Sequence, residues 1–186
     1  FVMITREQDP EPRLQVGRYG VPFFGVDVEG LEPGESAVID AQTLGSPLES
    51  LGDLPPGTYY VQALFNLYSR FERADGHVVW MHDDRWEGQD WRRSPGNLVS
   101  EVREVHLDPG STGTVELQVE RALPPIEVPP DTRYVKRFRF ESPMLTAFWG
   151  RPIYLGATVL LPEGYEEHPE VRYPVIYYQG HFSLRA

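Results

Sequence analysis

Three tryptophans, Trp80, Trp86 and Trp91, lie in one acidic stretch, WMHDDRWEGQDW. An aromatic face beside carboxylates suits stacking on a sugar ring, or the wall of a hydrophobic ester pocket. This interpretation makes the three rings candidate substrate-binding residues, in a loop that could cap a catalytic site. The alternative places them in the core beneath a long loop, or at the contact to a second domain. The tendency of tryptophan toward burial favours that alternative.

The same region contains two histidines and several carboxylates, which raises the question of a metal site. His77 and His82 are five residues apart, which places them on opposite faces of a strand. The carboxylates also lack the regular oxygen-ligand spacing of a calcium-binding loop. We therefore expect a solvated acidic loop here, with no metal and no cofactor.

The elements that position these residues are predicted to be mainly β. Alternation of apolar side chains and turn dipeptides indicate about seven or eight short strands before residue 122 and no helix. The longest predicted strand runs over residues 58–68 and is apolar on both faces, which is typical of a central strand. We expect residues 1–122 to form an immunoglobulin-like β-sandwich.

A proline-rich stretch, LPPIEVPPD at residues 123–131, follows and is predicted to be an extended linker. After it the strand pattern starts again, with strands expected over residues 134–141 and 153–161 and a short apolar run at 174–178.

Residues 153–182, IYLGATVLLPEGYEEHPEVRYPVIYYQGHF, contain an ordered set of short motifs. They are Leu161-Pro162, Gly164-Tyr165, Tyr173-Pro174 and the glycine that follows the apolar run, Gly180. This order resembles the opening of the catalytic domain in esterase D-like α/β-hydrolases. Residues 22–25, 60–63, 75–77 and 94–97 also resemble the N-terminal region of exported bacterial esterases. The resemblance implies that residues 132–186 begin an α/β-hydrolase sheet that this chain does not complete.

The resemblance further implies that Gly180, His181 and Phe182 form the loop that supplies a backbone N–H to the oxyanion hole. A glycine there lets the backbone approach a developing oxyanion closely. The sequence departs from the family where Gln179 stands in place of the usual His or Asp. His181 either shapes the oxyanion loop or is an ordinary loop residue.

None of the serines lies in the Gly-x-Ser-x-Gly pattern that holds the nucleophile of this fold. In the family, nucleophile, acid and base all follow this point. We therefore expect the N-terminal part of an esterase-like serine hydrolase acting on carboxylic esters. It would be inactive alone and completed by a missing segment or another chain, and it would be located in the periplasm or outside the cell. The alternative is a non-enzymatic β module that binds carbohydrate or protein.

One arrangement of strands would favour each alternative. Residues 174–178 in a parallel sheet continued by another chain would favour the hydrolase. Residues 132–186 paired antiparallel with the first domain would favour the binding module.

Composition excludes several other classes of protein. With 17 basic and 28 acidic residues among 186, the net charge is −11, which argues against binding to a nucleic-acid backbone. Cysteine is absent, so no disulfide framework exists. No apolar run reaches the roughly 20 residues needed to span a bilayer.

Overall fold

The computed structural model describes residues 1–83, 90–111 and 113–178. The chain is mainly β, with antiparallel sheets, and it divides into two compact units. Unit 1 comprises Phe1–Leu67 and His82–Ile126, and unit 2 comprises Tyr68–Met81 and the residues from Glu127 onward. A hairpin that lies early in the sequence therefore groups with the later part of the chain.

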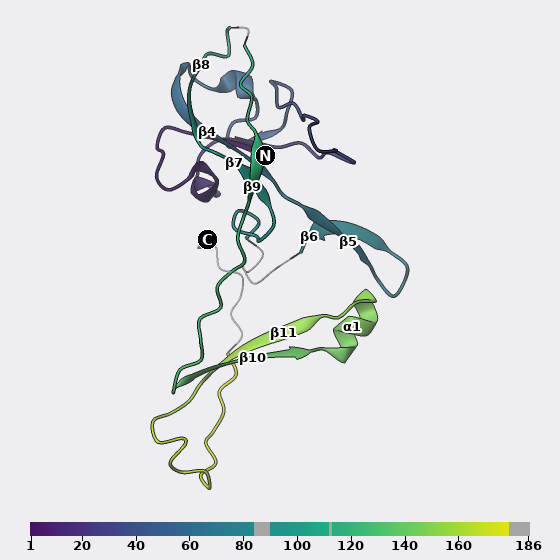
Figure 1. Cartoon of the computed structure of the whole chain (residues 1–186), viewed down its shortest axis with the longest axis vertical. Helices are drawn as coiled ribbons and strands as arrows, with labels where there is room; N and C mark the ends of the chain where they lie inside the picture. The colour runs from purple at the N-terminus through teal and green to yellow at the C-terminus, as the bar shows by residue number, and fades with distance from the viewer. Residues whose placement is uncertain (84–89, 112, 179–186) are drawn as a thin grey trace. The chain divides into compact units, whose positions relative to one another are not determined.

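Unit 1 is built on a seven-stranded antiparallel sheet (Figure 1). Its order is β3-β2-β1-β4-β7-β9, and β8 also pairs with β4. The strands are β1 (Val2–Thr5), β2 (Phe23–Phe24), β3 (Gly45–Ser46), β4 (Gly57–Phe65), β7 (Leu98–Ser100), β8 (Arg103–Leu107) and β9 (Val119–Ala122). Two 3-10 helices, η1 (Pro12–Gln15) and η2 (Leu51–Asp53), lie in the connections.

Strand β4 is central because apolar side chains are buried on both of its faces. Met3 and Leu64 belong to one core cluster, and Ile4 and Val61 belong to the other. In the pairing of β1 with β4, Ile4 lies opposite Val61, while Met3 lies opposite Gln62. The alternation of β4 thus places a buried polar residue, Gln62, on the same face as the first cluster.

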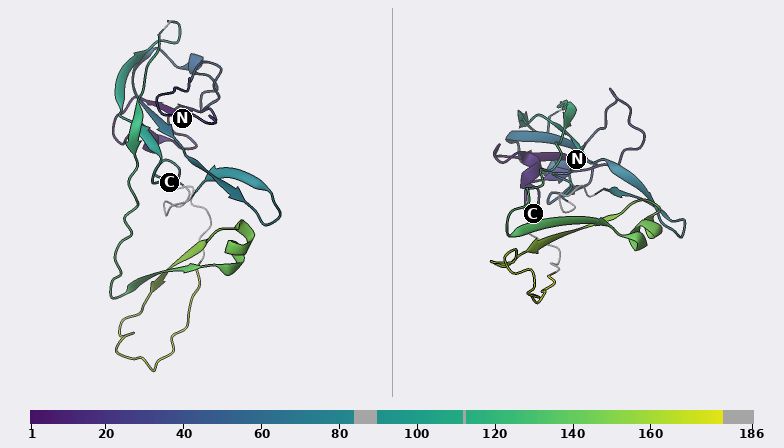
Figure 2. Two further views of the ribbon diagram at one scale, coloured as in Figure 1. Left: turned by 45° about the vertical axis from the view of Figure 1, so that its right-hand side comes forward. Right: turned by 60° about the horizontal axis from the view of Figure 1, so that its bottom comes forward.

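Unit 2 contains two hairpins, one formed by β5 (Tyr68–Glu72) and β6 (Val78–His82, whose last residue belongs to unit 1). The other is formed by β10 (Val135–Glu141) and β11 (Tyr154–Leu160), which pair antiparallel along their whole length. Helix α1 (Pro143–Trp149) lies between β10 and β11 in the chain and at one end of their hairpin (Figure 2).

Helix α1 was not expected from the sequence, and its local signals explain it. Ser142 is the N-cap, because its hydroxyl accepts from the Leu145 N–H, and Pro143 occupies the first turn. Gly150 ends the helix in the left-handed conformation, at φ 62°. The sequence analysis assigned no element to residues 143–149, so helix α1 is an addition to the predicted elements.

Two further features of unit 2 bear on the sequence predictions. Residues 174–178 are not assigned to a strand, so they do not lie in a parallel sheet among the described residues. Strands β10 and β11 pair with each other, and no described pairing joins them to the sheet of unit 1. Within the part of the chain that the structure describes, neither the parallel sheet expected of the hydrolase nor the antiparallel pairing expected of the binding module is present. No described helix is long and apolar enough to cross a membrane.

Candidate functional site

The structure places two of the three candidate tryptophans in different units. Trp80 lies on β6 in unit 2, and it is 62% exposed. Trp91 lies in unit 1, where its ring stacks on Phe1 at a centroid distance of 4.7 Å and contacts Phe23 at 6.4 Å. Trp91 therefore contributes to the core of unit 1, and Trp80 remains available for binding. Trp86 lies outside the described residues.

The oxyanion-loop candidates Gly180, His181 and Phe182 also lie outside the described residues. The run that leads to them, residues 174–178, is exposed, with Ile176, Tyr177 and Tyr178 each above 90%.

The SPGN segment, quoted above for its resemblance, forms a buried turn. The Asn97 amide donates to Asn66 Oδ1 at 3.0 Å and to the Trp91 carbonyl at 2.8 Å. Its Oδ1 accepts from the Leu67 N–H at 2.9 Å. Asn97 is thus a hydrogen-bonding centre that holds two loops together, and its role in this structure is positional.

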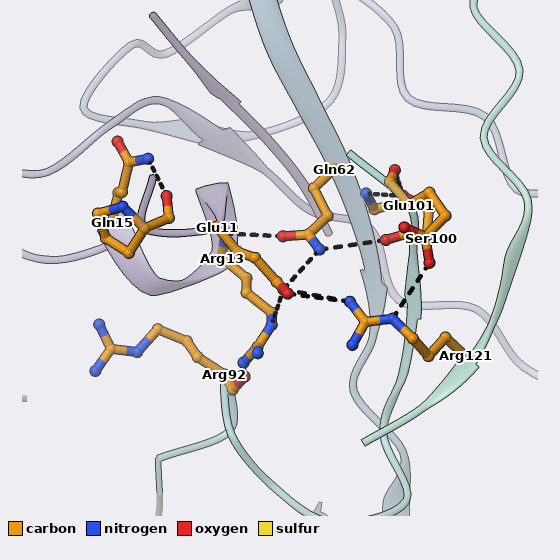
Figure 3. Close-up of polar contacts among 10 residues, drawn as sticks. Glu11, Arg13, Gln15, Gln62, Arg92, Ser100, Glu101 and Arg121 are labelled. Atoms are coloured by element: carbon orange, nitrogen blue, oxygen red, sulfur yellow. Dashed lines mark hydrogen bonds and ion pairs between the residues drawn. The ribbon is translucent and has the colours of Figure 1, made fainter. Parts of the chain in front are cut away.

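The most organised polar cluster in unit 1 is centred on Glu11, which precedes η1 (Figure 3). Its Oε2 accepts from Arg13 Nε at 2.8 Å and from Gln62 Nε2 at 3.0 Å. Arg121 Nη2, on β9, donates to Oε1 at 3.2 Å, and Arg121 Nε lies 3.4 Å from a carboxylate oxygen of Glu101. Glu11 is therefore held by two guanidinium groups and one amide.

Gln62 anchors this cluster from beneath, and its side chain is fully buried. Besides donating to Glu11, its Nε2 donates to the Ser100 carbonyl at 3.2 Å. Its Oε1 accepts from the Arg13 N–H at 3.1 Å. The buried Gln62 amide thus forms hydrogen bonds with a backbone N–H of η1, a backbone carbonyl of β7 and the Glu11 carboxylate. Buried polar groups in proteins are hydrogen-bonded in this way.

A surface cleft of about 370 Å³ opens over the cluster, lined by Gln8, Asp9, Glu11, Glu101, Val102 and Arg121. The cleft holds hydrogen-bond donors and acceptors but no serine or histidine, so it lacks the groups of a nucleophilic catalytic site. We infer that the cluster has a structural role, because its hydrogen bonds and ion pairs connect η1, β4, β7 and β9.

Sequence reasoning missed this cluster because its members lie far apart in the chain. Gln62 is 51 positions from Glu11, and Arg121 is 110 positions from it. The local sequence shows only an ordinary Glu-Pro-Arg loop, so no signal in it identifies the site.

Burial raises the pKa of Glu11, but the hydrogen bonds from Gln62 and Arg13 and the charges of Arg13 and Arg121 outweigh it. The net pKa therefore lies below its ordinary value of 4.5. A carboxyl group whose pKa is lower in the folded state stabilises the fold above its unfolded pKa. That stabilisation is lost as the pH falls through the folded value.

We expect the wild-type protein to lose more stability than Glu11→Gln when the pH is lowered from 6 to below 4.5. The reason is that protonation removes the two ion pairs of Glu11 only where the carboxyl is present. Urea unfolding over this pH range measures the difference, with Glu116→Gln, an exposed acid outside the cluster, as control. Parallel pH profiles for the wild type and Glu11→Gln would contradict the expectation.

Among the described residues, no group of three or more His, Asp or Glu side chains could hold a metal ion. His77 directly precedes β6 and His82 is its last residue, and the two do not belong to such a group.

Comparison with known proteins assigns neither a family nor a function to this chain. No protein-family model, curated protein or solved structure matches this chain. Its function must therefore be argued from its own residues.

Proposed function

We propose that this chain is the N-terminal part of an esterase-like serine hydrolase that acts on small carboxylic esters. In this proposal unit 1 is an accessory immunoglobulin-like domain, and the residues after 131 begin an α/β-hydrolase sheet. Gly180, His181 and Phe182 would supply part of the oxyanion loop. The ordered motifs of residues 153–182 motivate the proposal.

The observation that carries it is the unfinished state of the β10–β11 hairpin. Because opposed residues share a face, Phe138, Phe140, Leu155 and Val159 all lie on one side of the hairpin. All four are at least 39% exposed. A two-stranded hairpin with one apolar face is not stable by itself in water, since such a face requires a covering layer.

The exposed run at residues 174–178 supports the same conclusion. A wholly apolar strand sequence is typical of a strand buried on both faces of a sheet, yet Val175 is 70% exposed here and the three residues after it are more than 90% exposed. Both features fit the first strands of a larger sheet whose remaining strands and helices come from residues outside these 186.

The proposed reaction begins when a serine oxygen, supplied from outside these residues, attacks the ester carbonyl. A base takes the serine proton, and a backbone N–H of the 180–182 loop stabilises the oxyanion. The alcohol leaves with that proton, and an acyl-enzyme remains. Water then adds to the acyl carbon, the acid is released, and the serine regains its proton.

Labelling with a fluorophosphonate, which reacts with activated serines, tests the proposal. The protein is isolated from its source as the intact gene product, labelled, digested and analysed by mass spectrometry. We expect one labelled serine, outside the 186 residues described here, together with hydrolysis of p-nitrophenyl acetate. The 186-residue chain alone is the control and should remain unlabelled.

If the intact gene product shows neither labelling nor turnover, the hydrolase proposal fails. The alternative, a non-enzymatic β module that binds carbohydrate or protein, would then be the function to test.

A further inference from the structure

The β5–β6 hairpin has two faces of different character. The Arg73 N–H donates to the His77 carbonyl at 2.9 Å, which closes the turn around Gly76. A regular antiparallel ladder continued from this bond places Trp80 opposite Arg70. Tyr68, Arg70, Glu72 and Trp80 then share one face, which we call the outer face, and Phe71 and Arg73 lie on the inner face.

The inner face is fixed to helix α1. Phe71, which is 7% exposed, contacts Trp149 edge-to-face at a centroid distance of 5.7 Å. The guanidinium of Arg73 lies over the Phe148 ring at 5.2 Å, and the Ala74 N–H donates to the Phe148 carbonyl at 2.6 Å. Apolar, cation–π and backbone contacts together fix the hairpin on the helix.

The outer face remains exposed. Trp80 is 62% exposed and Tyr68 is 47% exposed. On the same face, Arg70, which lies opposite Trp80, forms an ion pair of 2.8 Å with Glu72. The Trp80 ring is not needed for the packing of Phe71 and Arg73 on helix α1, so its exposed surface is available to a ligand.

Charge restricts the kind of ligand that this face can bind. On the hairpin, Arg70 pairs with Glu72 and Arg73 pairs with Asp75. Unit 2 as a whole carries equal numbers of basic and acidic residues, so the net charge of −11 lies entirely on unit 1. A neutral ligand fits this face better than a nucleic acid or a polyamine.

The pattern of the face restricts the ligand further. The charged Arg70 and Glu72 follow Tyr68 on β5, and Arg70 lies opposite Trp80, so the aromatic side chains form no continuous apolar area of the size that a protein partner covers. A sugar ring presents one apolar C–H face and a rim of hydroxyl groups. The C–H face can stack on an indole, and the hydroxyl groups can form hydrogen bonds with a paired guanidinium and carboxylate.

We propose that the outer face of the β5–β6 hairpin binds a neutral sugar ring of an oligosaccharide. The ring stacks on Trp80 with Tyr68 beside it, and its hydroxyls bond to Arg70 and Glu72. This binding needs no hydrolysis, so the inference stands independently of the proposed function.

Isothermal titration calorimetry with cellohexaose, xylohexaose and maltohexaose tests the inference on the 186-residue chain. We expect at least one of the three to bind. Trp80→Ala should weaken that binding about tenfold or more, because it removes the stacking surface. Trp80→Phe should retain most of the affinity.

Tyr19→Ala is the matched control, because Tyr19 is 88% exposed and lies in unit 1. It should leave the affinity unchanged. Trp80 lies on the exposed face, so its replacement should not disturb folding, and Tyr68→Ala gives a second variant at the same face. The inference is overturned if no probe binds, if Trp80→Ala binds as tightly as wild type, or if Tyr19→Ala is equally damaging.

The two proposals can fail separately. Sugar binding without fluorophosphonate labelling would support the hairpin site and remove the hydrolase. Labelling without sugar binding would leave the hydrolase and remove the hairpin site.

Discussion

Replacing Gln62 with leucine should lower the free energy of unfolding of unit 1 by about 3 kcal/mol. Leucine has a similar volume, so the change removes hydrogen bonds without leaving a large cavity. The Arg13 N–H loses its acceptor, and Glu11 Oε2 and the Ser100 carbonyl each lose a donor. Glu11 keeps its bonds from Arg13 and Arg121, but a buried polar group left without a partner carries the full cost of its desolvation.

Urea denaturation followed by tryptophan fluorescence measures this loss, because one of the four tryptophans, Trp91, packs in unit 1. Glu101→Gln is the matched control at the edge of the cluster. The Glu101 side chain is exposed and its contact with Arg121 spans 3.4 Å, so its loss should cost less than about 0.5 kcal/mol. Gln62→Leu as stable as the wild type would show that the Glu11 cluster does not hold unit 1 together.

The same variant should also change the titration of Glu11. Gln62 is one of the donors that lower the pKa of this carboxyl, so its removal raises the pKa toward the ordinary value. Acid should then destabilise Gln62→Leu less steeply than it destabilises the wild type.

Strands with regular alternation could be predicted from the sequence. The strand predicted over residues 58–68, which is apolar on both faces, contains most of β4. The strands predicted over residues 134–141 and 153–161 correspond to β10 and β11. Residues 36–40 are also rich in strand-forming side chains, but no described pairing includes them. Intrinsic preference alone does not make a strand when no neighbouring strand is available to pair with it.

Helix α1 shows why a short element is difficult to predict. Seven residues span only two turns, which is too few to reveal a helical period. Ser142-Pro143 follows the strand predicted over residues 134–141, where a proline ends a strand, although the same pair is a favourable helix start. The contacts of Phe148 and Trp149 with the β5–β6 hairpin supply the packing that a short helix needs.

Whether a candidate site could be predicted depends on how far apart in the sequence its interacting residues lie. The tryptophans are candidate binding residues because of their residue type. The sequence could not show that Trp80 is exposed while Trp91 packs in a core. The Glu11 cluster depends on partners from β4 and β9, which only the sheet topology brings together. Local sequence therefore identifies candidate side chains, while tertiary pairing decides which of them form a site.

Replacing Phe71 with alanine should release the β5–β6 hairpin from helix α1 while unit 1 stays folded. The variant loses the buried ring and its edge-to-face contact with Trp149, which costs about 3 kcal/mol. It also removes the ring over which Arg151 lies at 4.8 Å. The hairpin should then open more often, because a two-stranded ribbon is marginal without packing.

Hydrogen exchange measures this opening at single amides. The Ala74 amide, bonded to the Phe148 carbonyl, should exchange roughly a hundredfold faster in Phe71→Ala, as a loss of about 3 kcal/mol requires. The Ala63 amide of unit 1, bonded to Ser100 Oγ, should exchange as in the wild type. Phe71→Leu should protect Ala74 to an intermediate extent, and Trp80→Ala, on the outer face, should leave it unchanged.

The same variant links anchoring to binding, because an outer face that is no longer fixed must lose conformational entropy when a ligand stacks on it. Phe71→Ala should therefore weaken oligosaccharide binding although Phe71 does not lie on the outer face. Equal affinity in Phe71→Ala and the wild type, with Ala74 exchange accelerated as expected, would show that the hairpin binds its ligand without help from α1. Unchanged exchange at Ala74 would show instead that the contact between Phe71 and Trp149 does not hold the hairpin.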